Sequence, residues 1–255
     1  MTKPFHGAKL KIERANQHIN DLYQQSRKFS NTRPYSISVE NNTETGDSFL
    51  KISTDQAAPE SLLLIVGDVI HNLMCALDFT MNDIEFATQG VRTKHTKFPI
   101  YDTRNDLVVA CNGGLKKKAP KAIIDFIVDA VQPYKGGRGE PLWSLHALDI
   151  EDKHRLLIAK KDVTHIRTIH CKDGRGEDFT VTEWALVHPK ISVYPCFGHN
   201  NVQVTDKGEA SIGIVFGDGM PIYGKAILPT LRDLSHFVSG TINSIEKVFL
   251  AARNP

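Results

Sequence analysis

Apolar residues recur every three or four positions in several long stretches of the chain, which is the spacing of one buried face on an α-helix. Between residues 7 and 28 this spacing is kept by five residues, separated by charged ones: Ala8, Ile12, Ala15, Ile19 and Leu22. A helix is therefore predicted over 7–28. The same reasoning predicts helices from Pro59 to about Phe86, over 104–111 and 119–131, from Pro141 to about Ala159, and from Pro229 to 252.

Two regions alternate between apolar and polar residues instead, as half-buried strands do. The first has Ile37 and Val39, a polar turn over 41–47 and a returning segment over 49–52, which predicts a β-hairpin. The second predicts an antiparallel sheet with turns rich in glycine, aspartate and asparagine. Its strands are expected around 163–171, 178–187, 191–196, 201–205 and 210–216.

This order of elements predicts an α+β protein, in which a helical bundle packs with an antiparallel β meander and a C-terminal helix closes the fold. We expect residues 1–255 to form a single domain, because no shift in composition marks a linker. Within it, the mainly helical part with the N-terminal hairpin covers 7–160, the antiparallel strands cover 161–218 and the closing helix covers 229–252.

The composition is that of a globular protein, with 41% hydrophobic and 24% charged residues. Its 31 basic and 29 acidic residues leave a formal charge of +2, so neither nucleic acid nor an anionic membrane is expected as a partner. The longest apolar run, over 62–66, is far shorter than the roughly 20 residues of a membrane helix. The first residues also lack the apolar stretch of a signal peptide, so we expect a cytoplasmic protein.

Two further composition features suggest no chemistry by themselves. The cysteines are widely separated and form no C-x-x-C pair, so we expect reduced thiols, and none has a recognisable base-pairing context that would mark a nucleophile. They are Cys75, Cys111, Cys171 and Cys196. The run of three lysines over 116–118 is interpreted as a solvated turn.

The helix predicted from Pro59 carries one polar stripe on an otherwise apolar surface. On a wheel of about 100° per residue, six polar residues fall within about 120°: Asp68, His71, Asn72, Cys75, Asp78 and Asn82. A solvated face is the ordinary explanation of such a stripe. However, no Lys or Arg occurs from Glu60 to Val91, although solvated faces usually carry them. The stripe therefore favours the wall of a buried polar pocket.

A second polar cluster lies near the end of the helix predicted from Pro141. His146, Asp149 and Lys153 share one helical face, with Asp152 about 60° further round, so all four are able to converge on one space. The alternative is an ordinary helix end. In that case the basic residues over 153–155 suit the negative pole of the helix dipole and pair with acidic residues one turn earlier.

These two segments carry a resemblance. The chain contains G-D-V-I-H-N-L-M-C-A-L-D over 67–78 and L-H-A-L-D-I-E-D-K-H-R over 145–155. It resembles a family of uncharacterised bacterial proteins with a G-D-x-x-H-N-L-R-x-A-L-D helix and an L-x-x-L-x-x-x-D-K-H-R segment, over about residues 7–160. Met74 stands where such proteins often have Arg, and Phe79 where they often have His. The resemblance marks positions and implies no reaction.

We predict a small-molecule enzyme that carries out a hydrolytic or other acid–base reaction in a polar pocket between the two helices. In one scheme, His71, Asp78 and His146 hold a divalent metal ion, as helix-borne ligands do in bundles. The H-E-x-x-H motif of zincins and the Glu-x-x-His signature of di-iron bundles are both missing.

The second scheme needs no metal. His71 or His154 is the general base, Asp78 or Asp152 orients it, and Lys153 stabilises a developing negative charge. The residues expected to support the site by polar contacts are Asp68, Asn72 and Asp149.

Two other classes of function stay open at this point. One is a non-catalytic ligand-binding or interaction protein, in which the same residues form a buried polar network that fixes the helix register. The other is a ribonuclease-like helical protein, for which the Arg14–His18 and Arg232–His236 pairs are shorter than the usual spacing. The expected partners are a small-molecule ligand or substrate and a second copy of the chain in a homodimer.

Overall fold

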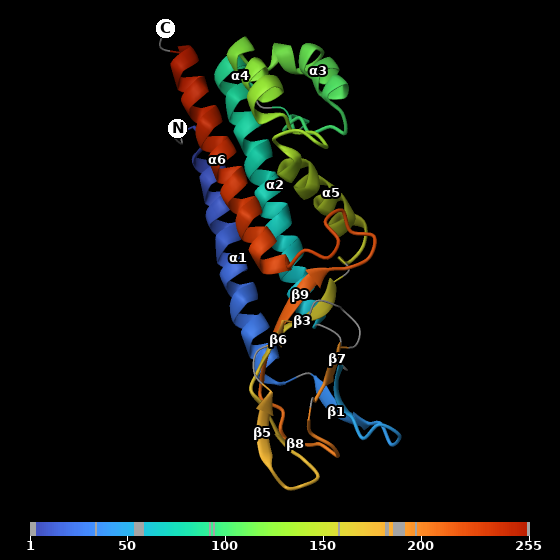
Figure 1. Ribbon diagram of the computed structural model, residues 1–255. Coiled ribbons are helices and arrows are strands. Elements are labelled where there is room, and N and C mark those ends of the chain that lie inside the picture. Colours follow the sequence, from blue (N-terminus) through green and yellow to red (C-terminus); the bar gives the residue numbers. More distant parts are fainter. Residues whose placement is uncertain are drawn as a thin grey trace.

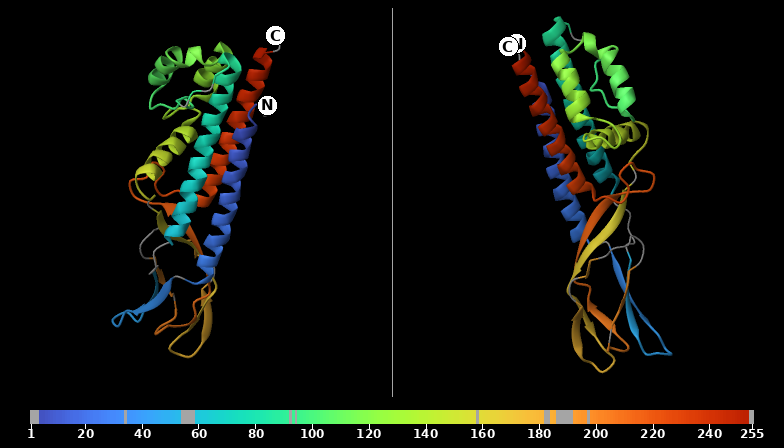
Figure 2. Two further views of the ribbon diagram at one scale, coloured as in Figure 1. Left: turned by 180° about the vertical axis from the view of Figure 1, so that it is seen from behind. Right: turned by 45° about the horizontal axis from the view of Figure 1, so that its top comes forward.

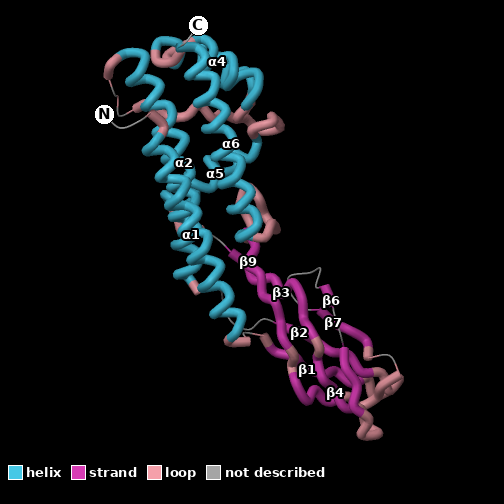
Figure 3. The backbone as a smooth tube through the Cα atoms, turned by 90° about the vertical axis from the view of Figure 1, so that its left-hand side faces the viewer, coloured by secondary structure: helices cyan, strands magenta, loops and turns pink. Residues whose placement is uncertain are grey.

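A computed structural model describes residues 4–33, 35–53, 59–91, 93, 95–157, 159–181, 184–185, 192–196 and 198–253. The fold is α+β, as predicted, and the molecule is elongated, with the helices at one end and the strands at the other (Figure 3). The chain enters the first long helix and leaves the last one at the end that lies away from the strands (Figure 1).

Three long helices, α1 (His6–Asn31), α2 (Glu60–Gln89) and α6 (Ile227–Arg253), lie side by side and contact one another (Figures 1 and 2). The five apolar residues that predicted the first of them are all buried. α2 ends where Gly90 adopts a left-handed conformation and its N–H bonds to the carbonyl oxygen of Phe86. Periodicity therefore located all three helices to within about three residues.

Shorter helices cover one side of this bundle. In chain order they are α3 (Arg104–Asn112), the 3₁₀ helix η1 (Leu115–Lys117), α4 (Lys121–Phe126), the π-helix η2 (Ile127–Val131) and α5 (Glu140–His154). The helix predicted over 119–131 is thus α-helical only in its first half. The prediction for α5 was five residues too long, because Arg155 is already extended and the chain enters a strand at Ala159.

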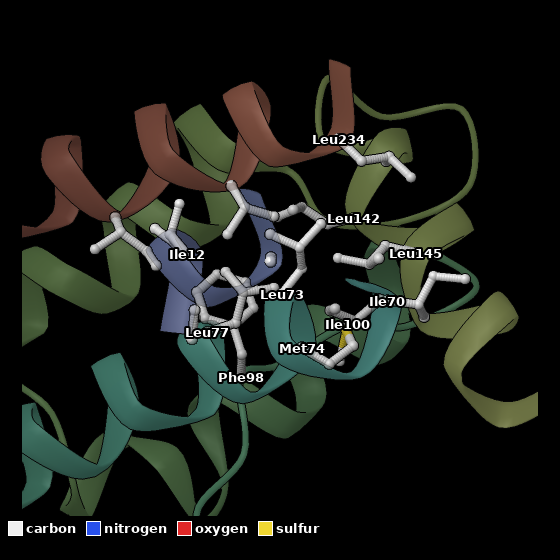
Figure 4. Close-up of a cluster of buried hydrophobic side chains, with 14 of the residues drawn as sticks. Ile12, Ile70, Leu73, Met74, Leu77, Phe98, Ile100, Leu142, Leu145 and Leu234 are labelled. Atoms are coloured by element: carbon white, nitrogen blue, oxygen red, sulfur yellow. The ribbon is translucent and has the colours of Figure 1, made fainter. Parts of the chain in front are cut away.

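The main hydrophobic core lies where α1, α2, α5 and α6 meet, and two residues of an extended segment complete it (Figure 4). Each large apolar side chain buried in this way stabilises the fold by about 1.5–3 kcal/mol. The labelled members are Ile12, Ile70, Leu73, Met74, Leu77, Phe98, Ile100, Leu142, Leu145 and Leu234. The buried side chains of Phe98 and Ile100 hold the segment over 95–101 against α2. This packing positions the polar residues described below.

By length and composition alone, α2 would be able to cross a membrane, which the short apolar runs of the sequence did not suggest. The helix is apolar on several faces because it packs against α1, α5 and α6 at once. Most of its apolar window is buried, as expected for a core helix and consistent with a soluble protein.

The strands form antiparallel pairs throughout the described chain, in three small sheets. The predicted hairpin of β1 (Ser36–Asn41) and β2 (Ser48–Ser53) is confirmed, and β7 (Ser192–Pro195) adds to it. The other two sheets have the orders β6-β3-β9 and β5-β4-β8. Their strands are β3 (Ala159–Arg167), β4 (Ile169–Lys172), β5 (Asp178–Val181), β6 (Trp184–Ala185), β8 (Gln203–Asp206) and β9 (Glu209–Phe216).

The single strand predicted over 163–171 is divided between β3 and β4. Thr168 separates them with a φ of 53°, a left-handed conformation that a continuous strand excludes. A second hydrophobic cluster fills the space between the strands, apart from the helical core: Tyr35, Leu50, Ile169, Cys171, Cys196 and Val202. The expectation of a single domain stays a prediction.

Candidate functional site

Asp149 is the centre of the polar contacts between α2 and α5. Its side chain is only 3% exposed, although it lies one turn from the end of α5. Lys153 Nζ, one turn further along, donates to Asp149 Oδ2, and His71 Nδ1 from α2 lies 3.4 Å from Asp149 Oδ1. A carboxylate only accepts hydrogen bonds, so His71 makes this contact with a protonated Nδ1, which leaves Nε2 as an acceptor in the neutral ring.

Cys75 completes a line of three side chains. It follows His71 by one helical turn, and its Sγ lies 3.4 Å from His71 Nε2. The order is therefore thiol, imidazole, carboxylate, with the outer groups on opposite nitrogens of the ring. The expectation that no cysteine lies beside a base was wrong, because a spacing of four on a helix places Cys75 directly over His71.

The thiol of Cys75 is neutral at pH 7 before reaction. Burial raises its pKa above the ordinary value, and the negative charges of Asp78 and Asp149 add to this effect. The ammonium groups of Lys11 and Lys153 oppose the shift but do not cancel it. The raised pKa favours the neutral thiol, so a reaction of Cys75 requires a base to take the proton.

Asp78 and Asn82 hold the extended segment against α2. Asp78 Oδ1 accepts a hydrogen bond of 2.9 Å from the backbone N–H of Phe98, and Asn82 Nδ2 donates to the carbonyl oxygen of Thr96 at 3.1 Å. Burial raises the pKa of Asp78. Asp78 or Asp152 was expected to orient the histidine base, but the structure gives the contact with His71 to Asp149.

Asp68, Asn72 and Asp152 lie around the same helix crossing. Asn72 is buried, and its amide links Lys11 of α1 to the backbone carbonyl of Asp68. Burial raises the pKa of Asp152, and the charges of Asp149 and Asp68 raise it further. The Asp152 carboxylate lies so close to Gly67 that a Cβ at this glycine would overlap it. The glycine in the first third of α2 therefore leaves room for the side chain of Asp152.

Replacing Gly67 by alanine tests this close approach. In a helix interior the change by itself stabilises by about 1 kcal/mol, as expected for the control variant Gly240→Ala in α6, where nothing lies near the added Cβ. In Gly67→Ala we expect this gain to be cancelled by displacement of Asp152. Chemical denaturation of both variants measures the difference, and equal stabilisation would show that Asp152 moves without cost.

His146 and His154 occupy different surroundings. His146 borders a pocket formed with the segment over 95–101, and its Nδ1 is buried without a hydrogen-bond partner among the described residues. Burial lowers the pKa of His146. His154 is exposed at the end of α5, as the helix-end interpretation expects, and Arg155 pairs with Glu151 there.

His71, Asp78 and His146 are not placed as a ligand set. Within the described part of the chain, no group of three or more His, Cys, Asp or Glu side chains is arranged to hold a metal ion. Asp78 is directed to a backbone N–H and His71 to Asp149, so the contacts of both are made within the protein.

Sequence reasoning missed two buried carboxylates. Glu85 of α2 accepts hydrogen bonds from Thr93 and Thr96 and pairs with Lys118 at 3.3 Å, so one lysine of the supposedly solvated run is structural. At the strand end, Asp173 accepts hydrogen bonds from Arg175 and His199. Burial alone would raise the pKa of Asp173, but its hydrogen bonds outweigh burial and lower it to about 2.

No known protein family matches the chain, and neither does any curated protein or solved structure. The likeness to the bacterial family with the two motifs is therefore not supported by a family match and stays a resemblance. What the site is able to do has to be worked out from its own contacts.

Proposed function

We propose that the protein is a small-molecule enzyme in which Cys75 is the nucleophile, His71 the general base and Asp149 the carboxylate that orients the imidazole. One observation carries the proposal: Sγ lies 3.4 Å from Nε2, and Nδ1 of the same ring lies 3.4 Å from a buried carboxylate oxygen. Nucleophile, base and orienting group occur in this order in cysteine and serine hydrolases of unrelated folds. Such contacts are often longer without substrate than in the reacting complex.

The reaction that fits is hydrolysis through an acyl-enzyme. Cys75 Sγ attacks the carbonyl carbon of an ester, thioester or amide while His71 Nε2 takes the thiol proton. The bond to the leaving group then breaks, the leaving group receives that proton, and a thioester remains on Cys75. Water, deprotonated by His71, cleaves the thioester, releases the acid and restores the thiol. The buried Asp149 stabilises the imidazolium that forms in both steps.

Lys153 has a different role from the one expected. Its ammonium group is bound to Asp149, so it balances the buried carboxylate rather than standing free beside a reacting atom. All four cysteines are free, as is usual for proteins in a reducing compartment, which supports a cytoplasmic location. Homodimer formation stays a prediction.

The second candidate is a non-catalytic polar network. It is favoured by the fact that both oxygens of Asp149 already have partners and that the thiol of Cys75 is kept neutral. In this case the three side chains only fix the position of α5 against α2. The two candidates differ in whether His71 increases the reactivity of Cys75.

Acylation by p-nitrophenyl acetate tests the proposal at pH 7. Cys111, Cys171 and Cys196 are buried, so peptide mass spectrometry of the native protein is expected to find a hydroxylamine-sensitive acetyl group on Cys75. Cys75→Ser is expected to lose the adduct, and His71→Gln to form it about 100-fold more slowly. His236→Gln, which replaces an exposed histidine on α6, is the matched control and should react as the unchanged protein does. Equal rates in His71→Gln and His236→Gln would favour the network.

A further inference from the structure

A pocket of about 640 Å³ lies between the segment over 95–101, η1 and α5. Its volume is in the range of small-molecule sites. Phe98, Ile100, Tyr101 and Leu115 contribute apolar surface, whereas the lining contains no Asp or Glu. Its basic side chains are Lys97 and Lys118, and the imidazoles of His95 and His146 also line it.

The positive charge of this pocket comes mainly from Lys97. Lys118 is paired with the buried Glu85, so its charge is balanced. Lys97 is exposed and makes no ion pair with a described residue. Burial lowers the pKa of His146 and the charge of Lys97 lowers it further, and the same charge opposes the upward shift that burial causes at Asp78. The charge of Lys97 therefore influences His146 and Asp78, although no described carboxylate forms an ion pair with Lys97.

His146 forms the side of the pocket that belongs to α5. Its Nδ1 is buried and has no hydrogen-bond partner in the part of the chain that the structure describes. Because this atom has almost no accessible surface, a molecule in the pocket meets the part of the His146 ring that lines the pocket and not Nδ1. His146 also precedes Asp149 by one turn of α5, and the charges of Asp149 and Lys153 act on it. The pocket and the Cys75 site are thus within electrostatic range of each other.

We propose that this pocket binds a small organic oxyanion, a carboxylate or a phosphate ester, with an apolar body. Lys97 pairs with the oxyanion, the His146 ring lies against the ligand, and the apolar residues of the lining contact its body. If the proposed function is correct, this ligand is part of the substrate of Cys75. The binding of an oxyanion in the pocket is proposed independently of that function.

Isothermal titration with four probes of similar size, each with one phenyl ring, tests the proposal on the full-length protein. Benzoate and phenyl phosphate carry the two oxyanions, benzyl alcohol is neutral and benzylamine is cationic. We expect one or both oxyanions to bind and the other two probes to bind at least about tenfold more weakly. The stronger of the two oxyanions shows whether the natural ligand is a carboxylate or a phosphate.

Two lysine variants locate the binding. Lys97→Gln is expected to weaken oxyanion binding about tenfold, the effect of one charged hydrogen bond. Lys116→Gln removes the same charge from an exposed position of the neighbouring lysine run and is expected to have no effect. ¹⁵N NMR of the imidazole ring should show a change at His146 when the oxyanion is added.

Three results would overturn the proposal: no binding of either oxyanion, equal binding of benzyl alcohol, or equal weakening by Lys97→Gln and Lys116→Gln. These results leave the acylation of Cys75 untouched. Conversely, normal oxyanion binding together with acylation that is independent of His71 would overturn the proposed function alone.

Discussion

Replacing Asp149 by asparagine is expected to slow the acylation of Cys75 by between about 100-fold and 10⁴-fold. The amide has the same shape but no charge, so it cannot stabilise the imidazolium that His71 becomes when it takes the thiol proton. The amide also offers an N–H group to the ring, which favours the tautomer with the proton on Nε2, where it faces Cys75. The rate of p-nitrophenol release, followed together with the mass of the protein, measures the effect.

Glu151→Gln is the matched control for this experiment. Glu151 lies on the same helix and pairs with Arg155 at the same spacing of four at which Asp149 pairs with Lys153. Its pair lies at the surface, where solvent screens the charges and ion pairs contribute little, so the variant should acylate at the normal rate. If the two variants react equally fast, Asp149 is a structural residue and the catalytic proposal fails.

The second large effect is expected on stability, in the variant Lys118→Met. Removing this ammonium group leaves the carboxylate of Glu85 charged in a position where its side chain is 1% exposed. Loss of one partner from a buried pair typically costs 3–5 kcal/mol, and the hydroxyls of Thr93 and Thr96 remain to bind Glu85. We therefore expect the free energy of unfolding at pH 7 to fall by about 2 kcal/mol, measured by urea denaturation.

The pH dependence of unfolding distinguishes the loss of the Lys118–Glu85 ion pair from a loss of packing. Burial alone would raise the pKa of Glu85, but hydrogen bonds from Thr96, Thr93 and Lys118 outweigh it and lower the pKa below the ordinary value. The contribution of Glu85 to stability is therefore complete above the ordinary carboxyl pKa of about 4.3 and is lost as the pH falls through the folded value. The deficit of Lys118→Met should shrink in the same range, whereas Lys116→Met should match the unchanged protein at every pH.

The long helices could be predicted because their periodicity is local. In α1, α2 and α6 the buried face consists of apolar residues in consecutive helical turns, so the helices could be predicted without knowing what they pack against. The sheet order could not be predicted in this way. β3 pairs with β9 and β2 with β7 across long stretches of sequence, and the break at Thr168 depends on a single dihedral angle.

In the candidate site too, the features within one helix could be predicted, whereas the contacts between helices could not. The stripe on α2 and the face of α5 follow from helical geometry, and they included His71, Cys75, Asp149 and Lys153. Which carboxylate meets His71 depends on how α5 lies against α2, with Asp152 beside Gly67, and neither helical pattern specifies this. Glu85 could not be identified, since its three partners come from a loop and from a lysine run that resembles a solvated turn.

The separation of the buried apolar side chains into two clusters has a consequence for local opening. The strand end is held by a small cluster, whereas the helices share a much larger one that contains none of its members. Amide protons of β4, β5 and β8 are therefore expected to exchange with solvent sooner than those of α2, through openings that leave the helices folded. Cys75, His71 and Asp149 belong to the slowly exchanging part, so the three side chains would stay assembled each time the strand end opens.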